Sequence, residues 1–269
     1  MSANLFIVPH DFTSVGDAAL KYALYLAKPR NTSIELLHIV NNKSNKAAAL
    51  QKLNSIIGNL DLGVGDAEVK AVVKVGNIFD DIGNIAEKKE ARMIVMGTHG
   101  AKGMQKLFGS YAIKVVTSTS VPFLVVQEGV PHREIKNIIV PIDVSKESLQ
   151  IINVAGEIAR TFDSKVHVIC ESQKDPRLSQ QMKIRISLVK KEYQEKDVKS
   201  SIEMIKGSKS YQHKVLSYAK KVEGDLIAVA YHSSSLFKAF DSYAQKLITN
   251  DENIPCLIVN SKLLSKLYY

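Results

Sequence analysis

Apolar residues follow two alternating patterns along the chain: short continuous runs, and longer stretches in which they recur with a helical period. Continuous runs indicate strands that are covered on both faces, whereas the helical period is typical of amphipathic helices. Thr13 and Ser14 are candidate N-caps of the first helix, which Pro29 ends. In the first half, the pattern predicts strands at 5–9, 33–40, 68–75, 92–96 and 121–127 and helices at 11–28, 45–59, 78–89 and 112–118.

The chain contains an internal repeat. The segment FGSYAIKVVT at 108–117 returns as FDSYAQKLIT at 240–249, with six of ten positions identical at an offset of 132. The same offset relates IVPHDF, which begins at Ile7, to IVPIDV, which begins at Ile139. A period close to half of the 269 residues indicates one domain that is present twice.

The second half shows the same order of patterns as the first. Its predicted strands are 137–141, 165–169, 198–205, 226–230 and 256–259, and its predicted helices are 147–161, 180–196, 210–222 and 243–249. Alternation of strands and helices predicts an α/β fold in which a doubly wound parallel sheet has helices on both faces and right-handed crossovers. We therefore expect two domains, 1–131 and 132–269, joined at the turn-prone segment 129–133.

Composition favours an ordinary globular protein over membrane-spanning, secreted or disulfide-rich classes. With 45% hydrophobic residues, each half can bury an ordinary core. No run reaches the roughly 20 apolar residues of a membrane span, and the N-terminal residues do not read as a secretory signal. Cys170 and Cys256 form neither a CxxC motif nor a disulfide framework. We expect a cytoplasmic protein without a membrane partner.

The net charge of +9 raises the question of polyanionic partners. The lysines are interleaved with acidic residues on predicted helices, as at 183–196, which favours solvated helix faces over a nucleic-acid surface. No zinc-finger spacing or aromatic RNA-binding motif is present. Nucleic acid is therefore not the expected partner.

Glycines cluster after the fourth predicted strand, in the sequence MGTHGAKG that begins at Met96, and Gly109-Ser110 opens the next helix. In doubly wound sheets, ligands bind at the carboxyl ends of the strands, where the winding direction switches. Glycines there expose backbone amides to an anion, and a helix start adds unpaired N–H groups. The Ser110 hydroxyl and the Lys102 ammonium could add further contacts. Tight-turn glycines without a ligand are the alternative, because neither the P-loop nor the dinucleotide motif is present.

The residues at these positions make the pattern specific. GTHGAKGMQKLFGS, followed by a helix and VPFLVV, resembles the signature of the universal stress protein family, as do IVPHDF and LLHIV. The resemblance covers both halves. It implies a tandem protein with domains of the adenine nucleotide alpha hydrolase-like type, which pair as a pseudo-dimer and bind ATP or another adenine nucleotide, with or without Mg. Eight residues separate Gly100 from Gly109, one fewer than in the family's pattern.

The resemblance also implies residue roles. Pro9, His10 and Asp11 would border adenine and ribose, and the backbone of Ile39 would meet the adenine edge. The remaining contacts, to ribose and phosphates, would come from Met96, Gly97, Thr98, His99, Gly100, Gly109, Ser110, Tyr111 and Ala112. The position of Tyr111 usually holds a smaller residue in the family.

Other interpretations of the polar residues remain open. Asp11 could cap its helix rather than bind a ligand. His10 and His99 could form a metal site with Asp11, although no ligand spacing requires one. His38 and His167 are interpreted as strand histidines whose nitrogens are hydrogen-bonded within the protein.

The second copy has lost the glycine pattern. Where the first half reads MGTHGAKG, the second reads VAYHSSSL, and Asp241 replaces Gly109. A carboxylate there would repel phosphate, so we expect a nucleotide in the first half alone. The alternative is a scaffold that binds no nucleotide and acts through protein partners or an apolar ligand.

The resemblance further implies how the domains associate and what they do. The last strands, 121–127 and 256–260, are expected to pair, and further dimerisation of the chain is left open. No pair of nucleophile and base supports a classical enzyme, so at most slow ATP hydrolysis is expected.

Overall fold

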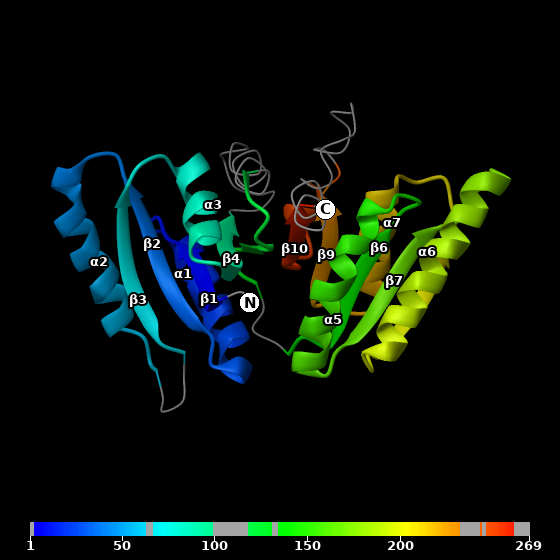
Figure 1. The fold of residues 1–269 in the computed structure, drawn as a ribbon, viewed down its shortest axis with the longest axis horizontal. Coiled ribbons are helices and arrows are strands. Elements are labelled where there is room, and N and C mark those ends of the chain that lie inside the picture. The colour runs from blue at the N-terminus through cyan, green and yellow to red at the C-terminus, as the bar shows by residue number, and fades with distance from the viewer. Residues whose placement is uncertain are drawn as a thin grey trace. The chain divides into compact units, whose positions relative to one another are not determined.

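A computed structural model describes residues 3–62, 67–98, 118–130, 134–231, 243 and 246–260. The chain divides into two compact units, Met1–Val130 and Pro131–Tyr269. Strands and helices alternate in both units, as Figure 1 shows. No helix among the described residues is long and apolar enough to span a membrane.

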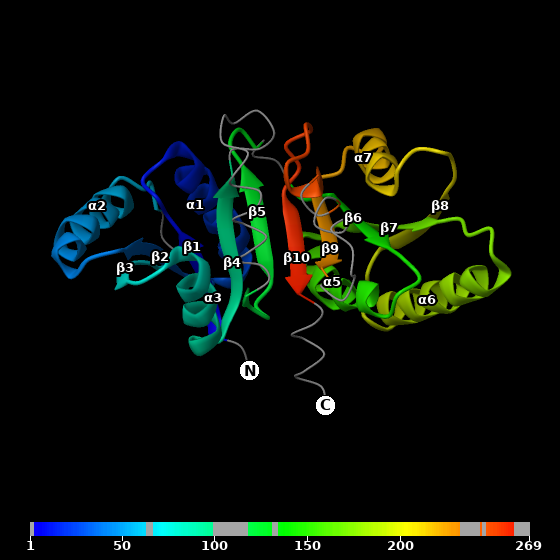
Figure 2. The ribbon, with the colours of Figure 1, turned by 90° about the horizontal axis from the view of Figure 1, so that it is seen from above.

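The first unit is a five-stranded parallel sheet in the order β3-β2-β1-β4-β5. Helices α1 and α2 cover one face and α3 covers the other (Figure 2). The elements are β1 (Ala3–Pro9), α1 (Ser14–Ala27), β2 (Ser33–Val40), α2 (Lys46–Gly58), β3 (Val69–Val75), α3 (Ile78–Lys88), β4 (Ala91–Thr98) and β5 (Phe123–Gln127).

The second unit repeats this topology as β8-β7-β6-β9-β10, again with all strands parallel. Its elements are β6 (Asn137–Ile142), α5 (Ile151–Phe162), β7 (Lys165–Glu171), α6 (Pro176–Glu195), β8 (Ser200–Ile205), α7 (Tyr211–Lys221), β9 (Leu226–Tyr231) and β10 (Cys256–Asn260). The identical strand order confirms the α/β fold class and the internal repeat.

The core of each unit lies around its inner strands. Every residue of β5, β9 and β10 is buried, as is all of β6 except Asn137, and the centre of β1 is buried at Phe6, Ile7 and Val8. Strands buried on both faces read as continuous apolar runs, which is why their positions were predicted closely. In each unit the first and fourth strands are neighbours, so the winding direction switches between β1 and β4 and again between β6 and β9.

Several element boundaries differ from the prediction by one to four residues, and three of these differences have a local cause. Helix α1 begins at Ser14 rather than at residue 11, because the chain first makes a turn. Strand β4 continues to Thr98, since Met96 and the two residues after it pair with β5. Helix α6 begins at Pro176, where the Asp175 side chain accepts from two backbone N–H groups. The predicted helix 112–118 lies outside the described residues except for its last residue, which is helical.

Candidate functional site

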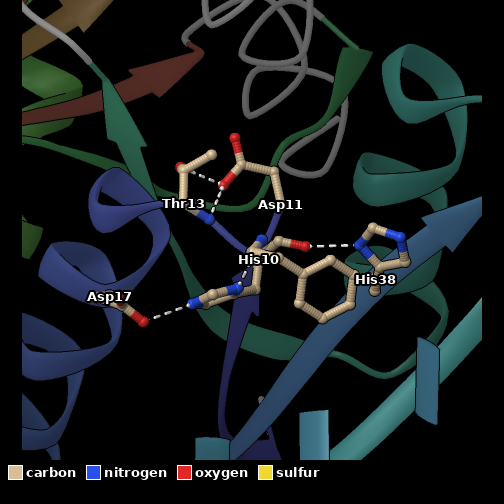
Figure 3. A network of polar contacts seen from close by, with 6 residues as sticks. His10, Asp11, Thr13, Asp17 and His38 are labelled. Atoms are coloured by element: carbon tan, nitrogen blue, oxygen red, sulfur yellow. Dashed lines mark hydrogen bonds and ion pairs between the residues drawn. The ribbon is translucent and has the colours of Figure 1, made fainter. Parts of the chain in front are cut away.

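The chain leaves β1 through a turn that local hydrogen bonds hold in place. Phe12 adopts a left-handed φ of 64°, a conformation that is costly for a residue with a Cβ atom. Its backbone N–H donates to Nδ1 of His10 over 3.0 Å. The Thr13 N–H donates to Oδ1 of Asp11 over 3.1 Å, and the Thr13 hydroxyl donates to the same oxygen. This turn places the N-terminus of α1 beside the end of β1 (Figure 3).

The ring of His10 braces this turn against α1. Because the Phe12 N–H can only donate, Nδ1 carries no proton, and Nε2 donates its proton to Oδ1 of Asp17 over 3.1 Å. The imidazole is fully buried. A Cβ atom on residue 16 would lie 2.9 Å from the ring, so Gly16 provides the space that the ring occupies. His10 therefore uses both ring nitrogens within the protein and contributes to the site by fixing its wall.

Asp11 is exposed, and its bonds to Thr13 form an Asx turn. The interpretation of Asp11 as a local cap thus accounts for both hydrogen bonds that Oδ1 accepts. The hydrogen bonds to this side chain within the described part of the chain reach Oδ1, so Oδ2 has no donor among those residues. A carboxylate oxygen in that situation can accept a hydrogen bond from a ligand.

The backbone of β4 passes directly against α1 at Gly97. A Cβ atom at this position would lie 2.2 Å from the carbonyl oxygen of Val15, which no side chain could tolerate. Thr98, the next residue, is buried, and its carbonyl oxygen accepts from the backbone N–H of Glu128 over 3.2 Å. The Glu128 carboxylate in turn accepts from the Ser14 hydroxyl over 2.6 Å. These contacts lock the end of β4 to the start of α1.

A pocket of about 140 Å³ opens between these elements, at the carboxyl ends of β1, β2 and β4. Of the residues predicted for the site, six line it: Pro9, His10, Asp11, Ile39, Met96 and Gly97. Thr98 does not line it. His99, Gly100, Gly109, Ser110, Tyr111 and Ala112 lie outside the described residues.

Half of the pocket wall was not predicted. The additional lining residues are Val15, Gly16, Leu37, His38, Ile78 and Ile82. Leu37 pairs with Pro9 in the β1–β2 register, so that register could have identified it. Ile78 and Ile82 are one helical turn apart on α3, and their spacing shows a shared face but not what that face covers.

His38 closes the pocket on the side of β2. Its Nδ1 lies 2.7 Å from the carbonyl oxygen of His10 and must donate, because a carbonyl only accepts. The neutral ring then presents Nε2 as an acceptor. The Phe12 ring packs against His38 with 4.3 Å between ring centroids, and the Lys52 ammonium lies 5.4 Å from the centre of the Phe12 ring. Most of the residues that line the pocket are apolar, and His38 adds an acceptor to its wall.

Comparison with known proteins agrees with this architecture. The model of the universal stress protein family matches twice, at residues 5–127 and 134–260. The chain belongs to the universal stress protein family. Universal stress protein MJ0531 of Methanocaldococcus jannaschii is 27% identical over 143 residues, which cover 48% of this chain and 83% of that protein. A second protein of that organism, MJ0577, is 23% identical over 150 residues, or 45% of this chain and 93% of its own length.

The fold also resembles that of a solved structure. A universal stress protein from Archaeoglobus fulgidus superimposes with a TM-score of 0.78 at 16% identity, covering 97% of this chain and all of its own. At this identity the likeness shows the fold. Both universal stress protein domains of the present chain are therefore α/β units of the family type, as the repeat predicted.

The second universal stress protein domain has the same turn after its first strand. Oδ1 of Asp143 accepts from the Ser145 N–H and hydroxyl, as Oδ1 of Asp11 does from Thr13. Since the turn occurs in both domains, it is a feature of the fold rather than evidence of a ligand. Among the residues that the structure describes, no group of three His, Cys, Asp or Glu side chains could hold a metal ion.

Proposed function

We propose that the first domain of this universal stress protein binds ATP or a related adenine nucleotide, with the base in the pocket at the ends of β1, β2 and β4. The observation that carries the proposal is the position of the pocket. It lies at the switch between β1 and β4, where ligands of doubly wound sheets bind.

The size and lining of the pocket favour one planar ring system. Pockets that enclose a drug-sized ligand measure roughly 300–1,000 Å³, so a volume of about 140 Å³ accommodates part of a nucleotide. Leu37, Ile39 and Ile82 supply apolar contacts for the faces of a ring. The Nε2 acceptor of His38 suits an exocyclic amine, which adenine carries.

The ribose and phosphates would extend from the pocket toward the end of β4. Asp11 is available there for a ribose hydroxyl, since Oδ2 keeps an open acceptor position. By family resemblance, the glycine-rich segment from His99 to Gly100 and the Gly109-Ser110-Tyr111-Ala112 segment would hold the phosphates. Glycines and a helix start suit an anion because backbone N–H groups can approach it closely. Mg would accompany ATP as the counter-ion of its phosphates.

Binding, rather than turnover, is the activity we propose. In the described part of the pocket, both nitrogens of His10 are committed to Phe12 and Asp17, so its ring is not free to act as a base. The sequence of the second domain has no glycines where the first domain has MGTHGAKG, so we propose that the second domain binds no nucleotide.

Isothermal titration calorimetry with ATP, ADP and AMP tests the proposal. We expect one site per chain and an affinity that falls as ionic strength rises, since phosphate recognition is partly screened. Mass spectrometry of denatured protein should release a co-purified adenine nucleotide if binding is tight. Two equivalent sites would contradict the assignment to the first domain. Absence of binding at millimolar nucleotide would favour a scaffold that acts through protein partners or an apolar ligand.

A further inference from the structure

Tyr211 stands in the second domain where Ile78 stands in the first. Each is the first residue of an eleven-residue helix, α7 and α3 respectively, that follows the third strand of its own sheet. Ile78 lines the pocket of the first domain and is 49% exposed. Tyr211 is a larger side chain in the same position, and its hydroxyl is placed very differently.

The Tyr211 hydroxyl lies at the carboxyl ends of β6 and β7. It is 2.9 Å from the carbonyl oxygen of Ile142 and 2.8 Å from that of Ile169, and its single proton is shared between them. By the repeat offset and the strand registers, these residues correspond to His10 and Leu37, which line the pocket of the first domain. The hydroxyl therefore reaches the floor of the equivalent pocket.

A second tyrosine stacks on the first. The rings of Tyr211 and Tyr243 are nearly parallel, at 4°, with 5.9 Å between their centroids. Burial is the largest cause that raises the pKa of each hydroxyl well above its usual value. Tyr243 belongs to the repeated segment whose first copy contains Tyr111. The stacked pair thus joins the start of α7 to the segment that, in the first domain, is proposed to hold phosphates.

From these contacts we infer that Tyr211 is a built-in occupant of the base pocket of the second domain. Its ring fills the position of a planar base, and its hydroxyl donates to backbone carbonyls at the strand ends. The second domain is thereby closed without a ligand. Removing the ring leaves a pocket for an uncharged purine nucleoside, because this domain lacks the glycines that a phosphate needs.

The variant Tyr211→Ile tests this inference, since it copies the residue of the first domain. Tyr211→Phe is the matched control, because it keeps the ring and loses only the hydroxyl. Backbone hydrogen exchange is followed in peptides covering β6, β7 and α7, with and without adenosine. We expect adenosine to slow exchange there in Tyr211→Ile, and to leave the parent and Tyr211→Phe unchanged. The inference would be overturned if adenosine slowed exchange in these peptides of the parent, or if it failed to slow exchange in folded Tyr211→Ile.

A second measurement applies even if Tyr211→Ile does not fold. The absorbance of tyrosinate is followed as the pH rises, in the parent and in Tyr211→Phe, up to the onset of unfolding. If the Tyr211 hydroxyl is enclosed, both proteins give the same amplitude before unfolding. An amplitude smaller by one tyrosine in Tyr211→Phe would place the hydroxyl in solvent and refute the inference. The function proposed for the first domain is tested separately, by hydrogen exchange in peptides covering β1 and β4 with and without AMP.

Discussion

The carbonyl oxygen of Val15 occupies the space that a side chain on Gly97 would need. A Cβ atom at residue 97 would lie 2.2 Å from that oxygen and 2.5 Å from Cγ1 of the same valine. The glycine therefore serves the packing of β4 on α1, in addition to any contact with a ligand. The sequence predicted that strand β4 ends at Met96 and that Gly97 begins a loop around ribose and phosphates, whereas Gly97 lies within the strand.

We predict that Gly97→Ala destabilises the protein by about 1–3 kcal/mol, because α1 must move away from β4. The matched control is Gly58→Ala at the end of α2, where an added Cβ atom meets nothing within 4 Å. That substitution should be neutral or stabilise by up to about 1 kcal/mol, since alanine favours the helix. Denaturant unfolding of both variants measures the difference. Equal effects would show that close approach at Gly97 has no energetic consequence.

The second domain should lose stability on mild acidification because of His167. Its Nδ1 lies 3.1 Å from the Tyr218 hydroxyl and its Nε2 lies 3.0 Å from Oδ1 of Asn137. Burial, followed by the nearby charge of Lys165, lowers the pKa of His167 from 6.5, and Glu203 opposes this shift. A lowered pKa in the folded state means that the unfolded chain binds the proton more readily. The contribution of neutral His167 to stability is therefore fully present above pH 6.5, and it is lost as the pH falls through the pKa of His167 in the folded state.

Urea unfolding of the parent and of His167→Gln, across this pH range, measures the effect. The slope of stability against pH should be smaller in His167→Gln than in the parent. His213→Gln removes an exposed histidine of α7 and should leave the slope unchanged. A parent slope that persists in His167→Gln would assign the pH dependence to other groups.

The sequence predicted the sheet more closely than it predicted the pocket. Strand β2 was predicted at its observed bounds, because its apolar residues Ile34, Leu36, Leu37 and Val40 are buried in the sheet and mark the strand in the sequence. Strand β4 was predicted too short, since a glycine was interpreted as the start of a loop. Helix α6 was predicted four residues late, although Asp175 followed by proline is a recognisable helix start.

Which side chains lie at the strand ends of each domain depends on the folded structure rather than on the local sequence pattern. Ile78 and Tyr211 both begin amphipathic helices, and nothing in their neighbouring residues shows that one lines a cavity while the other reaches two strand-end carbonyls. The tautomers of His10 and His38 likewise follow from backbone groups that come close only in the folded chain.

The repeat itself suggests a test of phosphate binding. Gly109→Asp copies Asp241 into the first domain and puts a carboxylate beside the proposed phosphate position. Nucleotide binding should weaken by about 2 kcal/mol or more, because like charges repel in a partly desolvated site. Gly109→Ala adds bulk without charge and should weaken binding less. Calorimetric titration and unfolding curves separate loss of binding from loss of folding. If folded Gly109→Asp binds nucleotide as tightly as the parent does, the phosphates do not lie beside residue 109.

The exchange of pocket residues between the domains gives the most direct test of the central claim. Ile78→Tyr places the tyrosine of the second domain in the pocket of the first, at a residue that is half exposed and so tolerates the larger ring. Ile78→Val is the control, because it leaves the pocket open. The measurement is calorimetric titration of AMP into folded parent and variants. We predict one site per chain in the parent and in Ile78→Val, and an affinity at least about tenfold lower, or roughly 1.4 kcal/mol, in Ile78→Tyr. Equal affinity of Ile78→Tyr and the parent would show that the nucleotide base does not occupy this pocket.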